Sequence, residues 1–537
     1  MATCNLRRTQ PRHWGIEVSH TTEREMLPRF SHTTKAKSRL RDWAVHAYLW
    51  SQRRKWPLPR AARSLGRKLF APQIDQMMLD RTDPWRLPLN LDIERAVLSP
   101  SPGMDLGGSR PVTAETTDVW LYEPLHSEAR PRIRCLIATG ALKLGGQEMV
   151  ALFLARHLPH HGFDTSIAHT PWDRSDEERA GALRLDGVPV VKLAEDTVAE
   201  WLSAHRPDVI SLHGAADWLV TAAAAARIPM IETLHGAPSF FDQRTLPTEQ
   251  LRSRDITGFV AVSELVRQQY LRFNPGCSPD RVITIPNGVD SRHIGRRDRA
   301  QARAWLGLRD EFLFVSLARY HLQKNTFGLV AAFSDVVRAC PEARLICAGD
   351  VVDRPYFEQV RQLRDRMPSA SQISLCGPCP DVSALLAAAD AFVLDSFFEG
   401  WSMASMEALF TGLPAVLSEV SGAREQVGEN GCRGIMVSNP LGDPEAIDWQ
   451  GISDARFRPQ LNRSELVEAM CTIIVERDAW HARREELRGE AMDLFSIDQC
   501  VQRHADVLMR AVVNANVAFN GPRVVNPLLR PAVTVPH

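Results

Sequence analysis

The sequence lacks any long apolar run, and this absence excludes proteins that cross a membrane with α-helices. A helix needs about 20 consecutive apolar residues to cross a bilayer, and no stretch of the 537 residues approaches that length. The first residues are polar and contain no short apolar core, so we also expect no secretory signal. Apolar residues still make up 44% of the sequence, an ordinary share for a globular protein. These features favour a cytoplasmic location.

Cysteine is also sparse, and its spacing excludes a framework of disulfides or zinc ligands. The ten cysteines are scattered along the chain, which suits a reducing compartment. Cys376 and Cys379 form a single C-x-x-C pair, and no second pair stands at the spacing of a zinc site. We interpret this pair as a turn after a strand and expect no bound metal.

The sequence has no net charge, but its charges are unevenly distributed. Lysine and arginine together number 64, as do aspartate and glutamate. Residues 1–75 nevertheless hold sixteen basic and five acidic side chains, so the remainder carries an opposite excess of eleven. The N-terminal stretch is therefore a basic arm attached to a mildly acidic body.

Within this arm, residues 36–70 interleave tryptophans with arginines and lysines. That pattern fits a helix lying on an anionic membrane surface, which would make the protein peripheral on the inner face of the membrane. It fits equally well a solvated arm that packs its tryptophans on the main body. A nucleic-acid partner would rest on the basic charge alone, and we do not expect one.

Beyond the arm, the chain alternates between strand-like apolar segments and helical segments. Its length suggests two domains. The alternation predicts an α/β fold, in which helices cover both faces of parallel sheets and ligands bind at the carboxyl ends of the strands. The expected strands are residues 133–140, 164–169, 188–193, 209–213, 229–234, 258–262, 281–285, 312–318, 343–349, 373–377, 391–394, 415–418 and 434–437.

The most informative stretch runs from residue 391 to residue 414. A short apolar segment over residues 391–396 predicts a buried strand, and residues 403–409 repeat their apolar side chains at helical spacing. The Gly-Leu-Pro sequence at residues 412–414 ends that helix. Free backbone N–H groups at the start of such a helix favour an anion. We expect them at Ser402, Met403 and Ala404.

Two carboxylates flank this predicted anion site. Glu399 lies on the loop between strand and helix, and Glu407 lies about two turns further along, in the helix body. Carboxylates cannot hold an anion themselves, but they can accept hydrogen bonds from hydroxyl groups. A ligand that carries both phosphate and hydroxyls, such as a nucleotide-sugar, satisfies the whole pattern.

Glu399 and Glu407 stand with seven residues between them, and this spacing resembles the E-x7-E motif of retaining glycosyltransferases of the GT-B fold, family 4. The resemblance implies that the first glutamate contacts the transferred sugar, the second contacts the ribose, and the amides between them hold phosphate. It also implies two Rossmann-like, doubly wound domains that face a central cleft. The preceding strand, Gly400 and the helix stop make the match more specific than the spacing alone.

Other motifs of the same family follow in order. The loop after residues 133–140 contains Gly145 and Gly146, which resemble the family's glycine pair at the cleft. His235 matches a family position that lines the donor and acceptor site, although a capping role in a loop would also explain a histidine there. His213 also follows a strand, and we consider it a second, weaker candidate for the same site. The turn at residues 286–290 marks the crossing into the second domain.

Two cations and one glycine complete the resemblance in the second domain. Arg319 and Lys324 follow the strand at residues 312–318 and resemble the Arg and Lys that the family directs at the donor diphosphate. Fixed cations there would stabilise the charge that develops when the sugar–phosphate bond breaks. Gly377 lies on the loop where the family contacts the nucleotide base through backbone atoms.

The sequence therefore predicts a retaining glycosyltransferase that takes a nucleotide-sugar and a saccharide or lipid-linked acceptor, in surface polysaccharide or glycolipid synthesis. It contains no D-x-D motif, so no metal cofactor is expected. A sugar-nucleotide epimerase, a sugar phosphorylase and an inactive scaffold of the same fold stay open as alternatives. The predicted parts are an extension and linker (1–130), an acceptor domain (131–290), a donor domain (291–475), helices crossing back (476–513) and a tail (514–537).

Overall fold

The computed structural model divides into two compact units, Met1–Trp85 and Arg86–His537. It describes residues of the second unit only, so the basic arm and the C-terminal tail lie outside the described residues. The described residues are 91–102, 132–140, 142, 146–169, 180–181, 183–184, 186–236, 245–290, 294–428 and 430–513.

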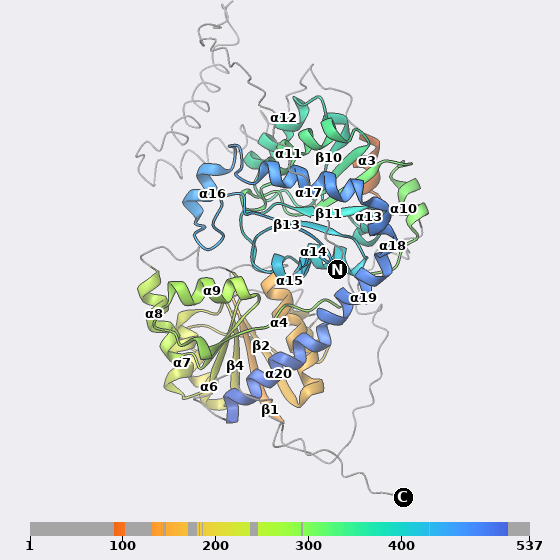
Figure 1. Cartoon of the computed structure of the whole chain (residues 1–537). Coiled ribbons are helices and arrows are strands. Elements are labelled where there is room, and N and C mark those ends of the chain that lie inside the picture. The colour runs from red at the N-terminus through yellow and green to blue at the C-terminus, as the bar shows by residue number, and fades with distance from the viewer. Residues whose placement is uncertain are drawn as a thin grey trace, which may run out of the picture. The chain divides into compact units, whose positions relative to one another are not determined.

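The first of two sheets contains seven parallel strands in the order β3-β2-β1-β4-β5-β6-β7. Its strands β1, β2 and β4 are labelled in Figure 1. The order reverses between β1 and β4. Strands β2 and β3 are added on one side of β1, and β4 to β7 are added on its other side. The strands are β1 (Ile133–Thr139), β2 (Phe163–His169), β3 (Val190–Lys192), β4 (Val209–His213), β5 (Met230–Leu234), β6 (Gly258–Ala261) and β7 (Val282–Thr284).

Helices cover both faces of this sheet, and the alternation of side chains along the strands explains why. Cys135 and Ile137 of β1 belong to one buried cluster, while Leu136 and Ala138 belong to another. The first cluster is filled by α4 (Gly146–His157) and the C-terminal helix α20 (Ile497–Val513). The second receives side chains from α6 (Val198–His205), α7 (Asp217–Ala225) and α9 (Glu264–Phe273). Successive residues of a strand point to opposite faces, so each strand contributes to two cores.

The second sheet has six parallel strands in the order β10-β9-β8-β11-β12-β13. Here the order reverses between β8 and β11. The strands are β8 (Phe312–Leu317), β9 (Ala343–Ala348), β10 (Ile373–Cys376), β11 (Ala391–Leu394), β12 (Ala415–Ser418) and β13 (Gly434–Val437). The two sheets and their parallel strands confirm the expected α/β fold with two Rossmann-like halves.

Two layers of helices also enclose the second sheet. Phe312 and Phe314 of β8 pack in one cluster with α11 (Thr326–Ala339) and α17 (Arg463–Val475). Leu313 and Val315 face the other layer, which contains α10 (Arg299–Trp305), α13 (Val382–Ala388), α14 (Met403–Phe410) and α15 (Ala423–Val427). We call the first sheet with α4, α6, α7, α8 (Leu246–Asp255), α9 and α20 the first lobe, and the second sheet with its helices the second lobe.

The chain passes between the lobes at two adjacent points. Val289 forms a parallel bridge with Ser496, and the backbone N–H of Val289 donates to the carbonyl of Phe495 at 3.0 Å. Gly288 permits this approach, because a Cβ atom there would lie 2.6 Å from the Cα of Ile497. After the crossing, α20 packs on the first sheet in Figure 1. The C-terminal helix therefore belongs to the first lobe.

Several helices are absent from the sequence prediction. They include α8 (Leu246–Asp255) and α12 (Arg354–Asp365), whose sequences are mostly polar and show only a narrow apolar stripe. The sequence predicts one helix over residues 477–492, whereas the structure has two helices there, α18 (Arg477–Ala482) and α19 (Arg484–Leu494). The short helices α3 (Leu91–Val97), α10, α13 and α15 are also unpredicted, as is α16 (Trp449–Ala455) in a loop-rich part of the second lobe. Periodicity does not identify short or strongly polar helices.

One segment of the predicted extension belongs to the second lobe. Helix α3 (Leu91–Val97) packs against β10, and Ile93 and Val97 are buried in the core. Ser101, which we had interpreted as part of a linker, is buried and donates a 2.6 Å hydrogen bond from its Oγ to Asp381. The chain is thus fixed to the second lobe well before the first sheet begins.

Candidate active site

The carboxyl ends of β8 and β11 lie side by side where the strand order of the second sheet reverses. A crevice forms at such a switch point in open parallel sheets, because the loops after the two strands turn to opposite faces. Arg319 and Lys324 come from the loop after β8, and Glu399 comes from the loop after β11. The fold therefore brings these predicted residues to one edge of one sheet.

Lys324 and Glu399 are directly paired. The Nζ atom of Lys324 lies 2.5 and 2.6 Å from the two carboxylate oxygens of Glu399. Their side chains are only 15% and 7% exposed. Ser396 also donates to Glu399, with 2.7 Å between Ser396 Oγ and Glu399 Oε1. The two donors hold the buried carboxylate of Glu399 in a fixed orientation.

The backbone joins the same two loops. The N–H of Phe397 donates to the carbonyl of Gln323 at 2.9 Å, and the side-chain amide of Gln323 donates to the carbonyl of Phe398 at 2.9 Å. These bonds run in parallel with the Lys324–Glu399 pair. The two loops consequently form one hydrogen-bonded unit.

Arg319 differs from Lys324 in its surroundings. Its side chain is exposed and forms no hydrogen bond or ion pair with the residues that the structure describes. Its backbone lies close to Gly349, where a Cβ atom would stand 3.2 Å from the Arg319 nitrogen. Arg319 is therefore a cation at the crevice edge whose guanidinium group is available to a ligand.

The start of α14 has the geometry of an anion site. Ser402 is the N-cap, and its Oγ accepts from the backbone N–H of Ser405 at 3.2 Å. The N–H groups of Met403 and Ala404 bond to nothing within the described part of the chain. Gln426 of α15 donates from its side chain to the Ser402 carbonyl at 3.2 Å, which fixes the helix start. Unpaired N–H groups and the helix dipole together attract negative charge.

Glu407 lies further along α14 and is half-buried. Burial alone raises the pKa of its carboxyl group to about 7. Among the described residues, no side chain or backbone group donates to it. A half-buried acceptor without a donor is costly, and a ligand hydroxyl group would relieve that cost.

Histidines line the matching edge of the first sheet. His213 ends β4 and His235 follows β5, and their rings face each other with 2.9 Å between His213 Nδ1 and His235 Nε2. The Oγ of Ser211 lies 3.0 Å from the other nitrogen of His213. Burial and the nearby His504 of α20 lower the pKa of His235 to about 3, and burial lowers the pKa of His213 well below its usual value. Both rings are neutral at physiological pH and act by hydrogen bonding.

The two predicted glycines of the first lobe are only partly described. Gly145 lies outside the described residues, and Gly146 is the first residue of α4. The next residue, Gln147, donates from its side chain to the carbonyl of His213 at 2.7 Å. This bond ties the start of α4 to the end of β4, on the two sides of the first sheet's switch point. Gln147 is not among the site residues predicted from the sequence.

The two lobes touch at the predicted site. Gly400, next to Glu399, lies so close to the His235 carbonyl oxygen that a Cβ atom would stand 1.7 Å from it. Ser263 of the first lobe and Ser421 of the second are hydrogen-bonded through their hydroxyls at 2.9 Å. His235 and Glu399 therefore stand at one contact, although they are 164 positions apart in the chain.

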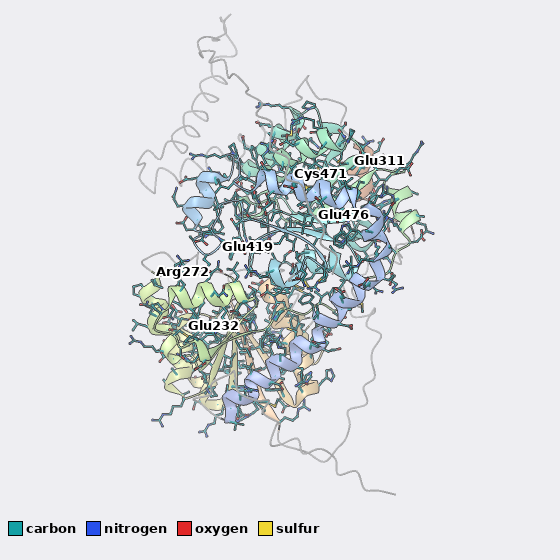
Figure 2. All side chains as sticks on the ribbon, viewed as in Figure 1. Glu232, Arg272, Glu311, Glu419, Cys471 and Glu476 are labelled. Carbon is teal, nitrogen blue, oxygen red and sulfur yellow. The ribbon has the colours of Figure 1, made fainter. Side chains whose placement is uncertain are left out.

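A second group of contacts lies along α9. The backbone N–H of Glu264 donates to the side chain of Glu425 at 2.7 Å. Arg272, labelled in Figure 2, forms an ion pair with Glu445 at 2.9 Å. Gln269 donates to the carbonyl of Pro444 at 2.7 Å. The first turn and the last turn of α9 are thus both joined to the second lobe.

Gly377 lies apart from these residues, directly after β10. Strand β10 is two strands away from β8, or about 10 Å at the usual strand spacing. The side chain of Leu98, which follows α3, lies 3.2 Å from the position that a Cβ atom of Gly377 would take. The structure therefore places Gly377 on the same sheet edge, next to the segment that precedes the first lobe.

Metal-binding residues are not gathered in the described part of the chain. It holds no group of three or more His, Cys, Asp or Glu side chains that could bind a metal ion. Cys376 ends β10 and is buried, while Cys379 lies in the following loop. Burial raises the pKa of the Cys379 thiol to about 11, so this thiol is protonated at neutral pH. The described helices also include none that is long and apolar enough to cross a membrane.

Comparison with known proteins identifies the class. Residues 144–293 match the family model described as Glycosyltransferase Family 4, and residues 298–450 match the model described as Glycosyl transferases group 1. Together the two matches cover more than half of the chain. The two lobes, each built on a parallel sheet, agree with these two matches. The chain belongs to the group 1 glycosyltransferases with the GT-B fold.

Individual relatives carry a range of activities. Glycogen synthase of Mycobacterium tuberculosis is 27% identical over 296 residues, which cover 47% of this chain and 67% of that protein. D-inositol 3-phosphate glycosyltransferase of Frankia alni is 26% identical over 336 residues, which cover 55% and 82%. Alpha-maltose-1-phosphate synthase of Mycolicibacterium smegmatis is 27% identical over 199 residues, and the chain spans only half of that relative's length.

The solved structures support the fold. The crystal structure of HepE from Anabaena in complex with UDP and glucose superposes with a TM-score of 0.57 at 19% identity, covering 70% of this chain and 99% of that one. Sucrose-phosphate synthase from Thermosynechococcus elongatus superposes with a TM-score of 0.54 at 15% identity, covering 71% and 100%. Both confirm the GT-B architecture that the sequence predicted.

Proposed function

We propose that this protein transfers a sugar from a nucleotide-sugar to an acceptor hydroxyl group, with retention of configuration at the anomeric carbon. The observation that carries the proposal is the convergence at the β8–β11 switch point. Arg319, the Lys324–Glu399 pair and the start of α14 stand there together, with His235 of the first lobe against them. A cation-rich site beside two glutamates suits a ligand that joins a diphosphate to a sugar and a ribose.

Hydrogen-bond donors and a cation would bind the diphosphate of the donor, and carboxylates would bind its hydroxyl groups. The free N–H groups of Met403 and Ala404, with the guanidinium group of Arg319, would bind the diphosphate. Glu407, a half-buried acceptor, would accept from the ribose hydroxyls. Glu399 would accept from hydroxyls of the transferred sugar, and Gly377 would contact the base through its backbone. Solved relatives bind comparable molecules, such as UDP and glucose in HepE.

The reaction itself would require a stabilised leaving group and a route for one proton. The acceptor oxygen attacks the anomeric carbon, a new glycosidic bond forms, and the bond from that carbon to the phosphate oxygen breaks. The acceptor's proton moves to the departing phosphate oxygen, so no separate base is needed. Arg319 and Lys324 stabilise the negative charge on the diphosphate as it develops, and attack from the leaving group's face retains configuration.

The side chains of the first lobe would serve the acceptor. His235 is neutral, so it can donate or accept a hydrogen bond at the sugar without adding charge. Its orientation is set by His213, which Ser211 contacts in turn. Relatives named for glycogen synthesis and for a galactosyltransferase acting on a diphosphoundecaprenol acceptor support a saccharide or lipid-linked acceptor here. Surface polysaccharide or glycolipid synthesis is the role we propose.

A screen of radiolabelled UDP-, GDP- and ADP-sugars would test this function. We expect one donor to be hydrolysed slowly without acceptor and transferred faster with one, and NMR of the product should show the donor's anomeric configuration. Inversion would refute retention. Interconversion of sugar nucleotides would indicate an epimerase. Cleavage that depends on phosphate would indicate a phosphorylase, and nucleotide binding without turnover would indicate an inactive scaffold.

Metal dependence is tested in the same assay. We propose that Arg319, Lys324 and the α14 start replace the metal ion that other glycosyltransferases use to neutralise the diphosphate. Turnover should therefore persist after treatment with EDTA. Loss of turnover that Mg²⁺ or Mn²⁺ restores would overturn this part of the proposal.

A further inference from the structure

We infer that Asp395 is a positioning residue that holds Lys324 in place through Asn325, and that it does so as a hydrogen-bond acceptor on both of its oxygens. This inference rests on the proposed function and deepens it. Asp395 directly follows β11 and is buried, and it lies four residues before Glu399. It is itself too enclosed to reach a substrate.

The contacts of Asp395 lead to both loops of the site. Its Oδ2 atom accepts from the side-chain amide of Asn325 at 2.8 Å, and its Oδ1 atom accepts from the amide of Asn462 at 2.8 Å. Asn325 directly follows Lys324 in the loop after β8. Phe397 lies two residues after Asp395, and its backbone N–H donates to the carbonyl of Gln323. Asp395 thus connects the base of the β8 loop to the base of the β11 loop.

Asn325 is in an unusual conformation that needs support. Its φ angle is 48°, in the left-handed region, where asparagine is tolerated better than most side chains. It caps α11, since its Oδ1 atom accepts from the N–H of Gly328 at 3.3 Å. Because Oδ1 is used in the cap, the amide nitrogen must face Asp395. Without this acceptor, the turn that carries Lys324 loses its anchor.

The same reasoning fixes the other amide. Asn462 donates from its side-chain nitrogen to the Ser438 carbonyl at 2.8 Å as well as to Asp395, so its nitrogen also must face the carboxylate. Two donors therefore converge on one carboxyl group. A proton on Asp395 would have no acceptor between them and would displace one of the amides.

Burial works against the ionised form that this network requires. It raises the pKa of Asp395 to about 7, although the hydrogen bonds from Asn462 and Asn325 lower it. The ionisable group that faces Asp395 from α12 is Tyr356, whose own pKa burial raises, so it is neutral. The flanking α11 and α17 contribute the neutral Asn325 and Asn462. The ionised fraction of Asp395, and with it the position of Lys324, would then change between pH 6 and 8.

An exchange of partners tests the inference. Asp395→Asn places a donor where an acceptor is needed, and we expect kcat to fall about 10- to 100-fold, the scale of a displaced catalytic group. The double variant Asp395→Asn/Asn325→Asp restores every bond: the new amide donates to the new carboxylate, its oxygen accepts from Asn462, and the carboxylate still caps Gly328. We expect it to recover most of kcat. Asp280→Asn, at an exposed aspartate before β7 in the first lobe, is the control and should leave kcat unchanged.

Further readouts separate positioning from a structural effect. KM for the donor should change less than kcat, and nucleotide affinity by titration calorimetry should be retained. At saturating donor, wild-type kcat should fall from pH 8 to pH 6, while Asp395→Asn should give a flat profile at the low value. Wild-type kcat in Asp395→Asn, or no recovery in the folded double variant, would overturn the inference. Absence of any wild-type turnover with all donors would instead reject the proposed function.

Discussion

The backbone of Gly400 lies against the carbonyl oxygen of His235, close enough that any side chain at residue 400 would overlap it. This contact joins the loop that carries Glu399 to the end of β5 in the other lobe. It explains why the loop needs glycine at a position where the backbone is not left-handed. The two halves of the site are therefore positioned by a contact that has no room for a methyl group.

Gly400→Ala should disturb catalysis more than stability. A Cβ atom would stand 1.7 Å from the His235 oxygen, so the loop or the lobe must shift, and we expect kcat to fall about a hundredfold, as for a 1 Å misplacement. Steady-state kinetics and a thermal melt measure the two effects. Gly489→Ala in α19 is the matched control, because nothing lies within 4 Å of its Cβ position. Equal activity of both variants would refute this role.

Lys324→Ala and Arg319→Ala should each lower turnover about a hundredfold, the scale for one lost charge stabiliser. The two should differ in stability. Lys324→Ala leaves the buried Glu399 without its cation, so we expect a lower Tm, whereas Arg319→Ala should melt like the wild type because its side chain is exposed. Arg354→Ala, an exposed arginine on α12, is the control. Near-normal rates in both site variants would remove the diphosphate assignment.

The two glutamates should divide the donor between them. Glu399→Gln should lower turnover and relax the choice of sugar while the free nucleotide still binds. Glu407→Gln should weaken nucleotide and nucleotide-sugar alike, because both carry the ribose and a hydrogen bond to a charged acceptor contributes roughly 1.5–3 kcal/mol. Titration calorimetry with the free nucleotide distinguishes them. Equal weakening by both substitutions would mean that the donor is not divided in this way.

Nucleotide affinity should depend on pH through Glu407. Burial raises the pKa of this carboxyl group to about 7, and only the ionised form accepts from both ribose hydroxyls. Affinity should therefore weaken as pH falls from 8 to 6, by about tenfold, the change in ionised fraction for a pKa of 7. The phosphate of the nucleotide also titrates, so Glu407→Gln provides the baseline. Parallel profiles for the two proteins would contradict the prediction.

Folding stability should respond to the same group in the opposite sense. The folded pKa of Glu407 lies above its unfolded value, so its contribution to stability is present at low pH and is lost as pH rises through about 7. The difference in Tm, Glu407→Gln minus wild type, should therefore be more positive at pH 8 than at pH 5. Thermal melts of the nucleotide-free proteins at the two pH values measure the difference.

Much of the site could be predicted because strands are visible in the sequence. Short apolar runs located β8 and β11, and parallel strands place the residues that follow them at one edge. Among those residues, Arg319, Lys324 and Glu399 are selected by their resemblance to the glycosyltransferase motifs. The partners of these residues could not be predicted. Asp395 meets Asn325 and Asn462 across 70 and 67 positions, and nothing local in the sequence marks such polar contacts.

The docked helix α3 has a consequence for how this protein can be shortened. Strand β10 is at the edge of its sheet, and the outward N–H of Leu375 donates to Glu94 of α3 at 3.1 Å, while Arg364 pairs with the same carboxylate at 2.9 Å. A chain that began at residue 131 would lack α3 and would uncover this edge. Bare strand edges recruit other chains, so such a fragment should aggregate. The minimal self-sufficient polypeptide starts upstream of α3.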